Sequence, residues 1–331
     1  MTPAHTAHDN TPASTATTAK QAGGTNPLQN LADALKPEMA SVNALIIDRM
    51  QSDIPLIPQL AGHLIAGGGK RIRPLLTLAS AALFDYKGSR QYKLAACVEF
   101  IHTATLLHDD VVDESDQRRG KASANAVFGN EAAVLVGDFL FSRSFQLMVE
   151  DGSLEVLRIL SNASAVIAEG EVMQLSIANN IDTTEADYLK VIGAKTAELF
   201  AAACEVGAIV ADRPAGECKA LRDYGTYLGL AFQISDDVLD YAASEERLGK
   251  SVGDDFKEGK MTLPVLKAIA KANAAEKSFW QRTLCDLEQG DADLAEAQSL
   301  IRKHKGLEQS LAQARDFAAK GRKCLEALPG N

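Results

Sequence analysis

The sequence predicts an all-α protein. From Leu28 onward apolar residues recur at helical spacing, as in the segments LRDYGTYLGLAFQISDDVLDY and SLAQARDFAAKGRKCLEAL. Clear alternating strands bounded by hairpin turns are absent from the sequence. No Pro-, Gly- or Ser-rich linker divides the chain, and no repeat with a period of roughly 20–50 residues is present. We therefore expect one large helical domain spanning residues 27–331.

The first 26 residues differ in composition from everything that follows. They are rich in Ala, Thr, Gly and Asn and carry almost no bulky apolar side chains. Such a segment buries too little apolar surface to offset its ordering entropy, so we expect a disordered tail over residues 1–26. The segment also lacks the apolar core of a secretory signal.

Along the rest of the chain, helical segments alternate with Gly- or Pro-bearing loops. Three segments are apolar on most sides, which is typical of central helices. They cover residues 94–113, 131–150 and 222–240. Four stretches carry the residues of turns and loops. They cover residues 66–74, 116–130, 211–217 and 245–264.

The amino-acid composition limits the kinds of protein to which this chain can belong. The 331 residues are 46% hydrophobic and 24% charged, which is typical of a soluble globular chain. A net charge of -10 argues against a general nucleic-acid binder. Five cysteines without a CxxC pair favour free thiols in a reducing compartment, so we expect a cytoplasmic protein. The apolar run LFAAACEVGAIVA contains Glu205, and we expect no segment with the roughly 20 apolar residues of a membrane span.

An acidic cluster follows the first central segment in LLHDDVVDESDQRRG. Asp109 and Asp113 are four residues apart, so both carboxylates lie on one helical face, one turn apart. Carboxylate oxygens at this spacing suit Mg²⁺, which keeps positions open for water and phosphate oxygens. Asp110 points elsewhere on the helix and fits a supporting role. A solvated helix face is the alternative interpretation.

The same spacing recurs in FQISDDVLDY, where Asp236, Asp237 and Asp240 again end an apolar helix. Solvated faces do not need apolar residues before each acidic cluster, so the repetition argues against that alternative. Two such clusters facing each other would hold several divalent cations around one polyanion.

Cationic residues that suit such an anion occur at several places. GGGKRIRP supplies Lys70, Arg71 and Arg73 on a Gly-rich loop, although a basic surface turn is the alternative and no Walker frame exists. Other candidates are Arg118 and Arg119 after the first cluster, Lys195 and Thr196 in an apolar segment, and Lys250 and Lys260 flanking SVGDDFKEG. His102 lies two turns before Asp109 on the same face, where a core or capping histidine is the plainer interpretation.

These motifs, in this order, resemble the trans-polyprenyl diphosphate synthases of the long-chain bacterial type. The resemblance covers the chain from about residue 28. It rests on GGGKRIRP, HTATLLHDDVVDESDQRRG, GEVMQ, AKTAELF, FQISDDVLDY and LGKSVGDDFKEGKMTLP. It implies the isoprenoid synthase type of helical bundle, acting on isopentenyl diphosphate and an allylic diphosphate.

The resemblance also implies a role for each motif residue, with two or three Mg²⁺ ions per active site. Asp109, Asp113 and Asp236 would bind Mg²⁺, with Asp240 as a further ligand, while Asp110 and Asp237 would support them. The implied isopentenyl diphosphate site comprises Lys70, Arg73, His102 and Arg119. The implied allylic site comprises Arg118, Lys195, Thr196, Gln233, Lys250 and Lys260. Lys195 completes the implied catalytic set with the aspartates.

Product length is implied by two small residues, Ala104 and Thr105, at positions where the family uses aromatic residues for short products. We expect an open tunnel and a product of about forty carbons for quinone side chains. The resemblance implies a homodimer and at most transient membrane contact for product release. Alternatives are a shorter product such as geranylgeranyl diphosphate, a non-catalytic subunit of a hetero-oligomeric synthase, a terpene cyclase and a helical interaction protein. The second aspartate cluster and GGGKRIRP argue against the cyclase.

Overall fold

The computed structural model describes residues 26–66, 69–118, 120–242 and 253–329. The expected tail, up to residue 25, therefore lies outside the described residues. The chain divides into two units, Met1–Ala34 and Leu35–Asn331. Within the first unit, α1 covers Pro27–Ala34. All other helices and both strands belong to the second unit.

The first half of the large unit is a series of helices with one small hairpin. It contains α2 (Lys36–Arg49), α3 (Leu56–Ala66), α4 (Ile72–Ala82), α5 (Arg90–Val112), β1 (Gln117–Arg118), β2 (Lys121–Ala122), α6 (Ala124–Phe128), α7 (Asn130–Asp151) and α8 (Leu154–Ile177). The second half contains α9 (Glu185–Ile192), η1 (Gly193–Ala197), α10 (Glu198–Val210), α11 (Ala215–Ala242), α13 (Asp254–Lys257), α14 (Leu263–Ile269), α15 (Ala274–Trp280), η2 (Gln281–Cys285), α16 (Asp293–Lys303) and α17 (Gly306–Leu325). The segments η1 and η2 are single π-helical turns.

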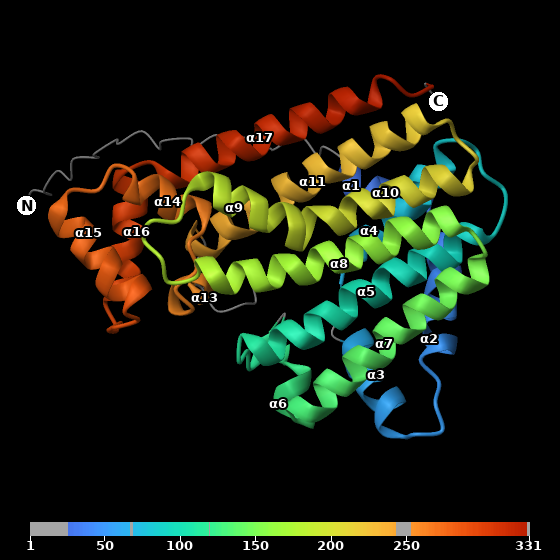
Figure 1. Ribbon diagram of the computed structural model, residues 1–331, viewed down its shortest axis with the longest axis horizontal. Coiled ribbons are helices and arrows are strands. Elements are labelled where there is room, and N and C mark those ends of the chain that lie inside the picture. Colours follow the sequence, from blue (N-terminus) through green and yellow to red (C-terminus); the bar gives the residue numbers. More distant parts are fainter. Residues whose placement is uncertain (1–25, 67–68, 119, 243–252, 330–331) are drawn as a thin grey trace, which may run out of the picture. The chain divides into compact units, whose positions relative to one another are not determined.

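The three helices expected at the centre form as predicted; all three begin earlier than expected, and α5 ends one residue earlier, at Val112. α5 and α7 pack along each other, α11 packs against both α10 and α17, and α10 also covers α4 (Figure 1). Every residue from Leu199 to Cys204 on α10 is buried, which matches its Ala-rich sequence. The all-α prediction is confirmed by this arrangement.

Two of the expected loops contain short regular structure. Residues 116–130 form the antiparallel pair β1–β2, with Gln117 opposite Ala122, and then helix α6. Ser123 caps α6 by accepting the backbone N–H of Ala126. Residues 253–264 contain α13 and the start of α14. The elements β1, β2, α6 and α13 are too short for a strand or helix period to show in the sequence.

Helix α7 contradicts the expectation that no segment is apolar over the length of a membrane span. By length and composition it is long enough to cross a membrane, and 39% of its most apolar window is buried. Core helices of globular proteins meet the same criterion, so this single helix is weak support for a span. Its contact with α5 is consistent with a core helix.

Candidate active site

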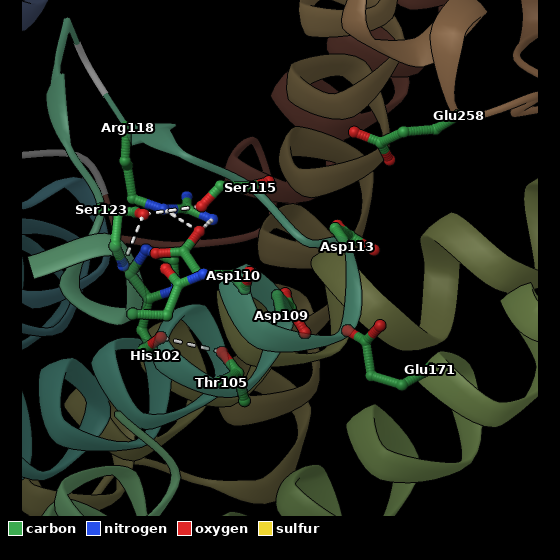
Figure 2. Close-up of polar contacts among 12 residues, drawn as sticks. His102, Thr105, Asp109, Asp110, Asp113, Ser115, Arg118, Ser123, Glu171 and Glu258 are labelled. Atoms are coloured by element: carbon green, nitrogen blue, oxygen red, sulfur yellow. Dashed lines mark hydrogen bonds and ion pairs between the residues drawn. The ribbon is translucent and has the colours of Figure 1, made fainter. Parts of the chain in front are cut away.

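The first acidic cluster lies at the carboxyl end of α5. Asp113 caps this helix, and its N–H donates to the carbonyl of Asp109, so the two carboxylates remain one turn apart as predicted. Figure 2 shows both side chains directed toward the side from which Glu171 and Glu258 approach. Burial raises the pKa of Asp109, and the nearby Lys195 ammonium opposes that rise.

Lys195 connects the first cluster to α8. Its Nζ lies 2.6 Å from Glu171 Oε2 and 3.7 Å from Asp109 Oδ2. The lysine sits in the π-helical turn η1, and π-helical turns are frequent at functional sites. Gly170 lets α8 approach this turn, since a Cβ there would lie 2.8 Å from the Lys195 backbone nitrogen. Burial, followed by the charge of Asp109, raises the pKa of Glu171.

Asp110 faces away from this space and holds the hairpin. Its side chain is 3% exposed and accepts Arg118 Nε at 2.7 Å. The Asp110 backbone carbonyl accepts from the Ser115 N–H at 2.9 Å and from Asn125 Nδ2 at 3.1 Å. Asp110 therefore fixes the segment after α5, which agrees with a supporting role.

The second cluster repeats this arrangement on α11. Asp236 is exposed, whereas Asp237 is 4% exposed and accepts from Tyr188 Oη at 2.6 Å and from Gln233 Nε2 at 2.8 Å. Gln233 Oε1 in turn accepts the Thr196 hydroxyl at 2.9 Å. Burial raises the pKa of Asp237 to about 6, against the opposing effect of these hydrogen bonds. Both oxygens of Asp237 are thus engaged by protein donors.

Asp240 differs from Asp109 and Asp113, because its carboxylate accepts a backbone N–H. Its Oδ2 accepts the backbone N–H of Asp255 at 3.2 Å, and its carbonyl accepts the N–H of Gly253. Asp240 therefore joins α11 to the segment that begins α13.

Lys260 brings the segment after α13 to the end of α5. Its Nζ lies 3.5 Å from Asp113 Oδ2 and 3.8 Å from Asp255 Oδ1, and it forms a short ion pair with Glu258. Burial lowers the pKa of Lys260, but the carboxylates of Asp255, Asp113 and Glu258 outweigh it and raise the pKa. Two lysines from separate segments thus contact the two carboxylates of the first cluster.

A pocket open to solvent lies along α5, beside the face that carries Asp109, and is bordered by α3 and the hairpin β1–β2. Its charged and titratable lining includes His63, Arg71, Glu99, His102, Arg118 and Lys121. Arg71 donates to Glu99 at 3.0 Å. Arg118 was expected at the allylic site, and the structure places it on this pocket together with His102.

Arg73 lies beside His102, with Nη1 3.0 Å from the imidazole Nε2, and its guanidinium stacks over the Phe200 ring at 4.5 Å. The structure therefore brings together two of the residues expected to bind isopentenyl diphosphate. Lys70 is exposed. Arg119 and Lys250 lie outside the described residues. Ala104 is buried, and Thr105 donates to the His102 carbonyl at 2.8 Å (Figure 2).

Several residues of the site were not assigned a role from the sequence. They are Glu171, Tyr188, Asp255 and Glu258 near the acidic clusters, and His63, Glu99 and Lys121 at the pocket. The two glutamates in the apolar segment AVIAEGEVMQ of α8 were a signal for Glu171, because a charge in such a segment needs a partner. The others are polar residues in loops or on helix faces where the sequence carries no comparable signal.

The donor set fits Mg²⁺ in its chemistry. Asp109, Asp113 and Asp236 offer hard carboxylate oxygens, while Asp110 and Asp237 are committed to protein partners. Within the described ranges, no three His, Cys, Asp or Glu side chains are already gathered as a complete metal site. The lysines at Asp109 and Asp113 show that this space accommodates positive charge.

Comparison with known proteins agrees with the geometry. The family model described as polyprenyl synthetase matches residues 54–301. The chain is 49% identical over 304 residues to an octaprenyl diphosphate synthase of Haemophilus influenzae, covering 91% of each chain. It is 48% identical over 302 residues to the octaprenyl diphosphate synthase of Escherichia coli, covering 91% of this chain and 93% of that one.

Two solved structures are also similar. One is a decaprenyl diphosphate synthase from Rhodobacter capsulatus, with 54% identity, a TM-score of 0.88, and 92% and 94% coverage of this chain and that one. The other is a polyprenyl synthase from Caulobacter crescentus complexed with calcium and isoprenyl diphosphate, with 52% identity, a TM-score of 0.90, and 93% and 94% coverage. With its helical fold and paired aspartate clusters, the chain belongs to the polyprenyl synthetase family and is a prenyltransferase.

Proposed function

We propose that the protein condenses an allylic diphosphate, starting from farnesyl diphosphate, with successive isopentenyl diphosphates to give a long all-trans polyprenyl diphosphate. The observation that carries this proposal is the convergence of Lys195 and Lys260 on Asp109 and Asp113. Carboxylates for a metal and ammonium groups for a diphosphate share one space there. The octaprenyl and decaprenyl synthases among its relatives support a long product.

In the proposed reaction the protein binds Mg²⁺ and orients the two diphosphates. Asp109, Asp113 and Asp236 would hold Mg²⁺, which supplies electrostatic stabilisation of the departing diphosphate. Lys195, Lys260 and the Thr196–Gln233 pair would contact the oxygens of the allylic diphosphate. Arg73, His102 and the cationic side chains of the pocket would orient the isopentenyl diphosphate.

The allylic C–O bond breaks first, and its electron pair leaves with the diphosphate. The double bond of isopentenyl diphosphate then attacks the allylic cation, and the new carbon–carbon bond forms. A proton leaves the carbon next to the new cationic centre for the released diphosphate. This route needs no separate protein base, and the apolar helices around the site would exclude water from the cation.

We propose a product of about forty carbons, used for quinone side chains. Small residues at Ala104 and Thr105 support a tunnel that stays open past the first cluster. A shorter product, as made by the geranylgeranyl diphosphate synthases that are also similar to the chain, is the alternative.

The proposal includes a cytoplasmic homodimer with two or three Mg²⁺ ions per site. Apolar side chains exposed on α7 and α8 of the single chain support a self-complementary interface. They include Leu135, Val149, Val172 and Leu175. The calcium in the Caulobacter crescentus complex supports the use of a divalent cation. Membrane contact would be transient, for release of the lipid product.

The test incubates the protein with Mg²⁺, farnesyl diphosphate and labelled isopentenyl diphosphate, and sizes the products by mass spectrometry. We expect a ladder that ends near forty carbons, lost on addition of a chelator. Asp109→Ala or Asp236→Ala should lower kcat by about 10²-fold or more, as for loss of electrostatic transition-state stabilisation. Asp316→Ala, an exposed aspartate on α17, is the matched control.

Other results of the same assay would favour one of the alternative functions. A product that stops at twenty carbons would keep the reaction and overturn the open tunnel. No incorporation of isopentenyl units with any allylic starter would favour the non-catalytic subunit, and a cyclic hydrocarbon would favour the cyclase.

A further inference from the structure

The turn that carries Lys260 accepts a side-chain amide of Gln289 on one side and the backbone N–H of Asn179 on the other. Gly259 has a φ of +67°, a conformation that favours glycine. A Cβ at this position would lie 2.1 Å from Asn179 Nδ2 and 2.6 Å from the Leu284 carbonyl oxygen. The turn before Lys260 therefore sits directly against the end of α8 and the π-helical turn η2.

Asn179 connects these two neighbours. Its Nδ2 donates to the Leu284 carbonyl at 2.8 Å, and its backbone N–H points to the Gly259 carbonyl at 3.4 Å. The residue itself adopts a left-handed conformation with φ +57°, which asparagine tolerates better than most residues. Asn179 lies two residues after the end of α8, the helix that carries Glu171.

Gln289 makes a second connection to the same turn. Its Nε2 donates to the Phe256 carbonyl at 2.8 Å and to the Thr283 carbonyl at 2.8 Å. The last carbonyls of a helix lack partners within the helix, and in η2 the carbonyls of Thr283 and Leu284 accept from Gln289 and Asn179 instead. Gln289 thus joins the Phe256 carbonyl to η2 through one amide. Asn179 joins Gly259 to η2, through its backbone N–H on one side and its side chain on the other.

We propose that Asn179, Gly259 and Gln289 form an amide latch that positions Lys260 over the first acidic cluster. The three are positioning residues, because they act through Lys260 and touch no reacting group. The inference rests on the proposed function for the role of Lys260 toward the allylic diphosphate.

The latch is needed because local charge alone does not direct Lys260 toward Asp113. Glu258 and Asp255 belong to the same short segment as the lysine and hold its ammonium wherever that segment goes. Asp240 fixes the start of this segment at Gly253 and Asp255. The position of the turn at its end then decides whether the ammonium also reaches Asp113 on α5. Fixing the turn against α8 and η2 therefore sets the distance between Lys260 and the end of α5.

The first test separates the latch from a general loss of stability. Asn179→Asp keeps the shape of the side chain but replaces its donor with an acceptor facing the Leu284 carbonyl. Asn180→Asp is the matched control, since Asn180 Oδ1 only accepts, from the Asp182 N–H, and aspartate retains that role. We expect Asn179→Asp to raise the KM for the allylic diphosphate about 10-fold or more, as misplacement of a binding group by about 1 Å can cost 10²-fold.

Under the proposal the KM for isopentenyl diphosphate changes less than twofold in Asn179→Asp, because Arg73 on α4 and His102 on α5, which are proposed to bind it, are not part of the latch. Gly259→Ala should act in the same direction. Its control is Gly152→Ala, at φ +78° with no atom within 4 Å of the added Cβ. Equal changes in both KM values, or a Gly259→Ala variant that behaves like Gly152→Ala, would overturn the latch.

The second test does not depend on catalysis. Amine acylation followed by mass spectrometry compares Lys260, 25% exposed, with Lys87, 81% exposed, in one sample. We expect the ratio of Lys260 to Lys87 labelling to rise several-fold in Asn179→Asp and to stay constant in Asn180→Asp. An unchanged ratio in Asn179→Asp would contradict the latch. An inactive wild-type protein would instead contradict the proposed function and leave the labelling result to decide the latch.

Discussion

At the scale of single residues, the middle aspartate of each cluster differs from its neighbours. Asp110 is buried against Arg118, and Asp237 is buried between Tyr188 and Gln233. Oδ1 of Asp110 and both oxygens of Asp237 accept protein donors, as buried carboxylates require. Asp109 and Asp113 instead face Lys195 and Lys260, and Asp236 is exposed. Each cluster therefore divides into an anchor and candidate ligands.

The anchor at Asp237 predicts the effect of Tyr188→Phe. Loss of a hydrogen bond to a buried charged group costs about 1.5–3 kcal/mol, so the end of α11 should be held less firmly. We expect kcat/KM for the allylic diphosphate to fall about tenfold and the Mg²⁺ concentration for half-maximal activity to rise. Steady-state kinetics over a Mg²⁺ series measures both.

Tyr92→Phe, in the first turn of α5, is the control for this substitution. Wild-type Mg²⁺ dependence in Tyr188→Phe would show that Gln233 alone suffices to hold Asp237.

At the scale of elements, the ends of helices position most side chains of the candidate site. α5 and α11 each present an acidic cluster in their last turns. The π-helical turn η1 presents Lys195, and η2 presents the two carbonyls that accept from Gln289 and Asn179. α15 shows how firmly such an end is fixed. Asn273 and Glu276 form a capping box at its start, and Glu276 also binds Lys303 and His304.

The contacts of Glu276 predict a pH-dependent contribution to stability. The hydrogen bond from Lys303, followed by those from His304 and the Asn273 N–H, lowers the pKa of Glu276 to about 2. A lowered carboxyl pKa stabilises the fold above the ordinary value, and the contribution is lost as the pH falls from about 4.3 toward 2. Glu276→Gln should therefore lower Tm at neutral pH, with a difference from wild type that shrinks below about pH 4.

Scanning calorimetry of both proteins at several pH values measures this difference. Glu308→Gln, an exposed residue in the first turn of α17, should show a small and constant difference. A Tm difference for Glu276→Gln that does not depend on pH would mean that the lowered pKa does not contribute to folding.

At the scale of the molecule, α7 and α8 present an apolar surface on the single chain. Leu135 and Val149 on α7 are 67% and 68% exposed, and Val172 and Leu175 on α8 are similarly exposed. Exposed apolar surfaces of this kind mark interaction sites. The proposed two-fold interface would bury them and would also explain why a helix with the composition of α7 belongs in this fold.

Leu135→Lys combined with Val149→Lys should weaken the dimer. Burying each apolar side chain contributes about 1.5–3 kcal/mol, so the dissociation constant should rise by about 100-fold or more. Size-exclusion chromatography with light scattering over a dilution series measures the mass. Ile54→Lys, also exposed, is the control. A wild-type protein that is monomeric throughout the series would overturn the proposed interface.

The sequence by itself determined the helical class and the chemical content of the site. Periodicity identified the central helices, and the spacing of Asp109 and Asp113 placed two carboxylates on one face, as the structure confirms. Both inferences depend only on neighbours within one helix, where the geometry is fixed by the backbone.

The tertiary structure alone decided which side chains meet. The contacts of Lys260 with Asp113, Tyr188 with Asp237, and Asn179 with Leu284 join segments far apart in the chain. The short elements β1, β2, α6 and α13 also escaped the sequence pattern, since each is too short to show a period. A sequence pattern identifies the face of a helix but not the partner that covers it, because that partner is set by the packing of the whole unit.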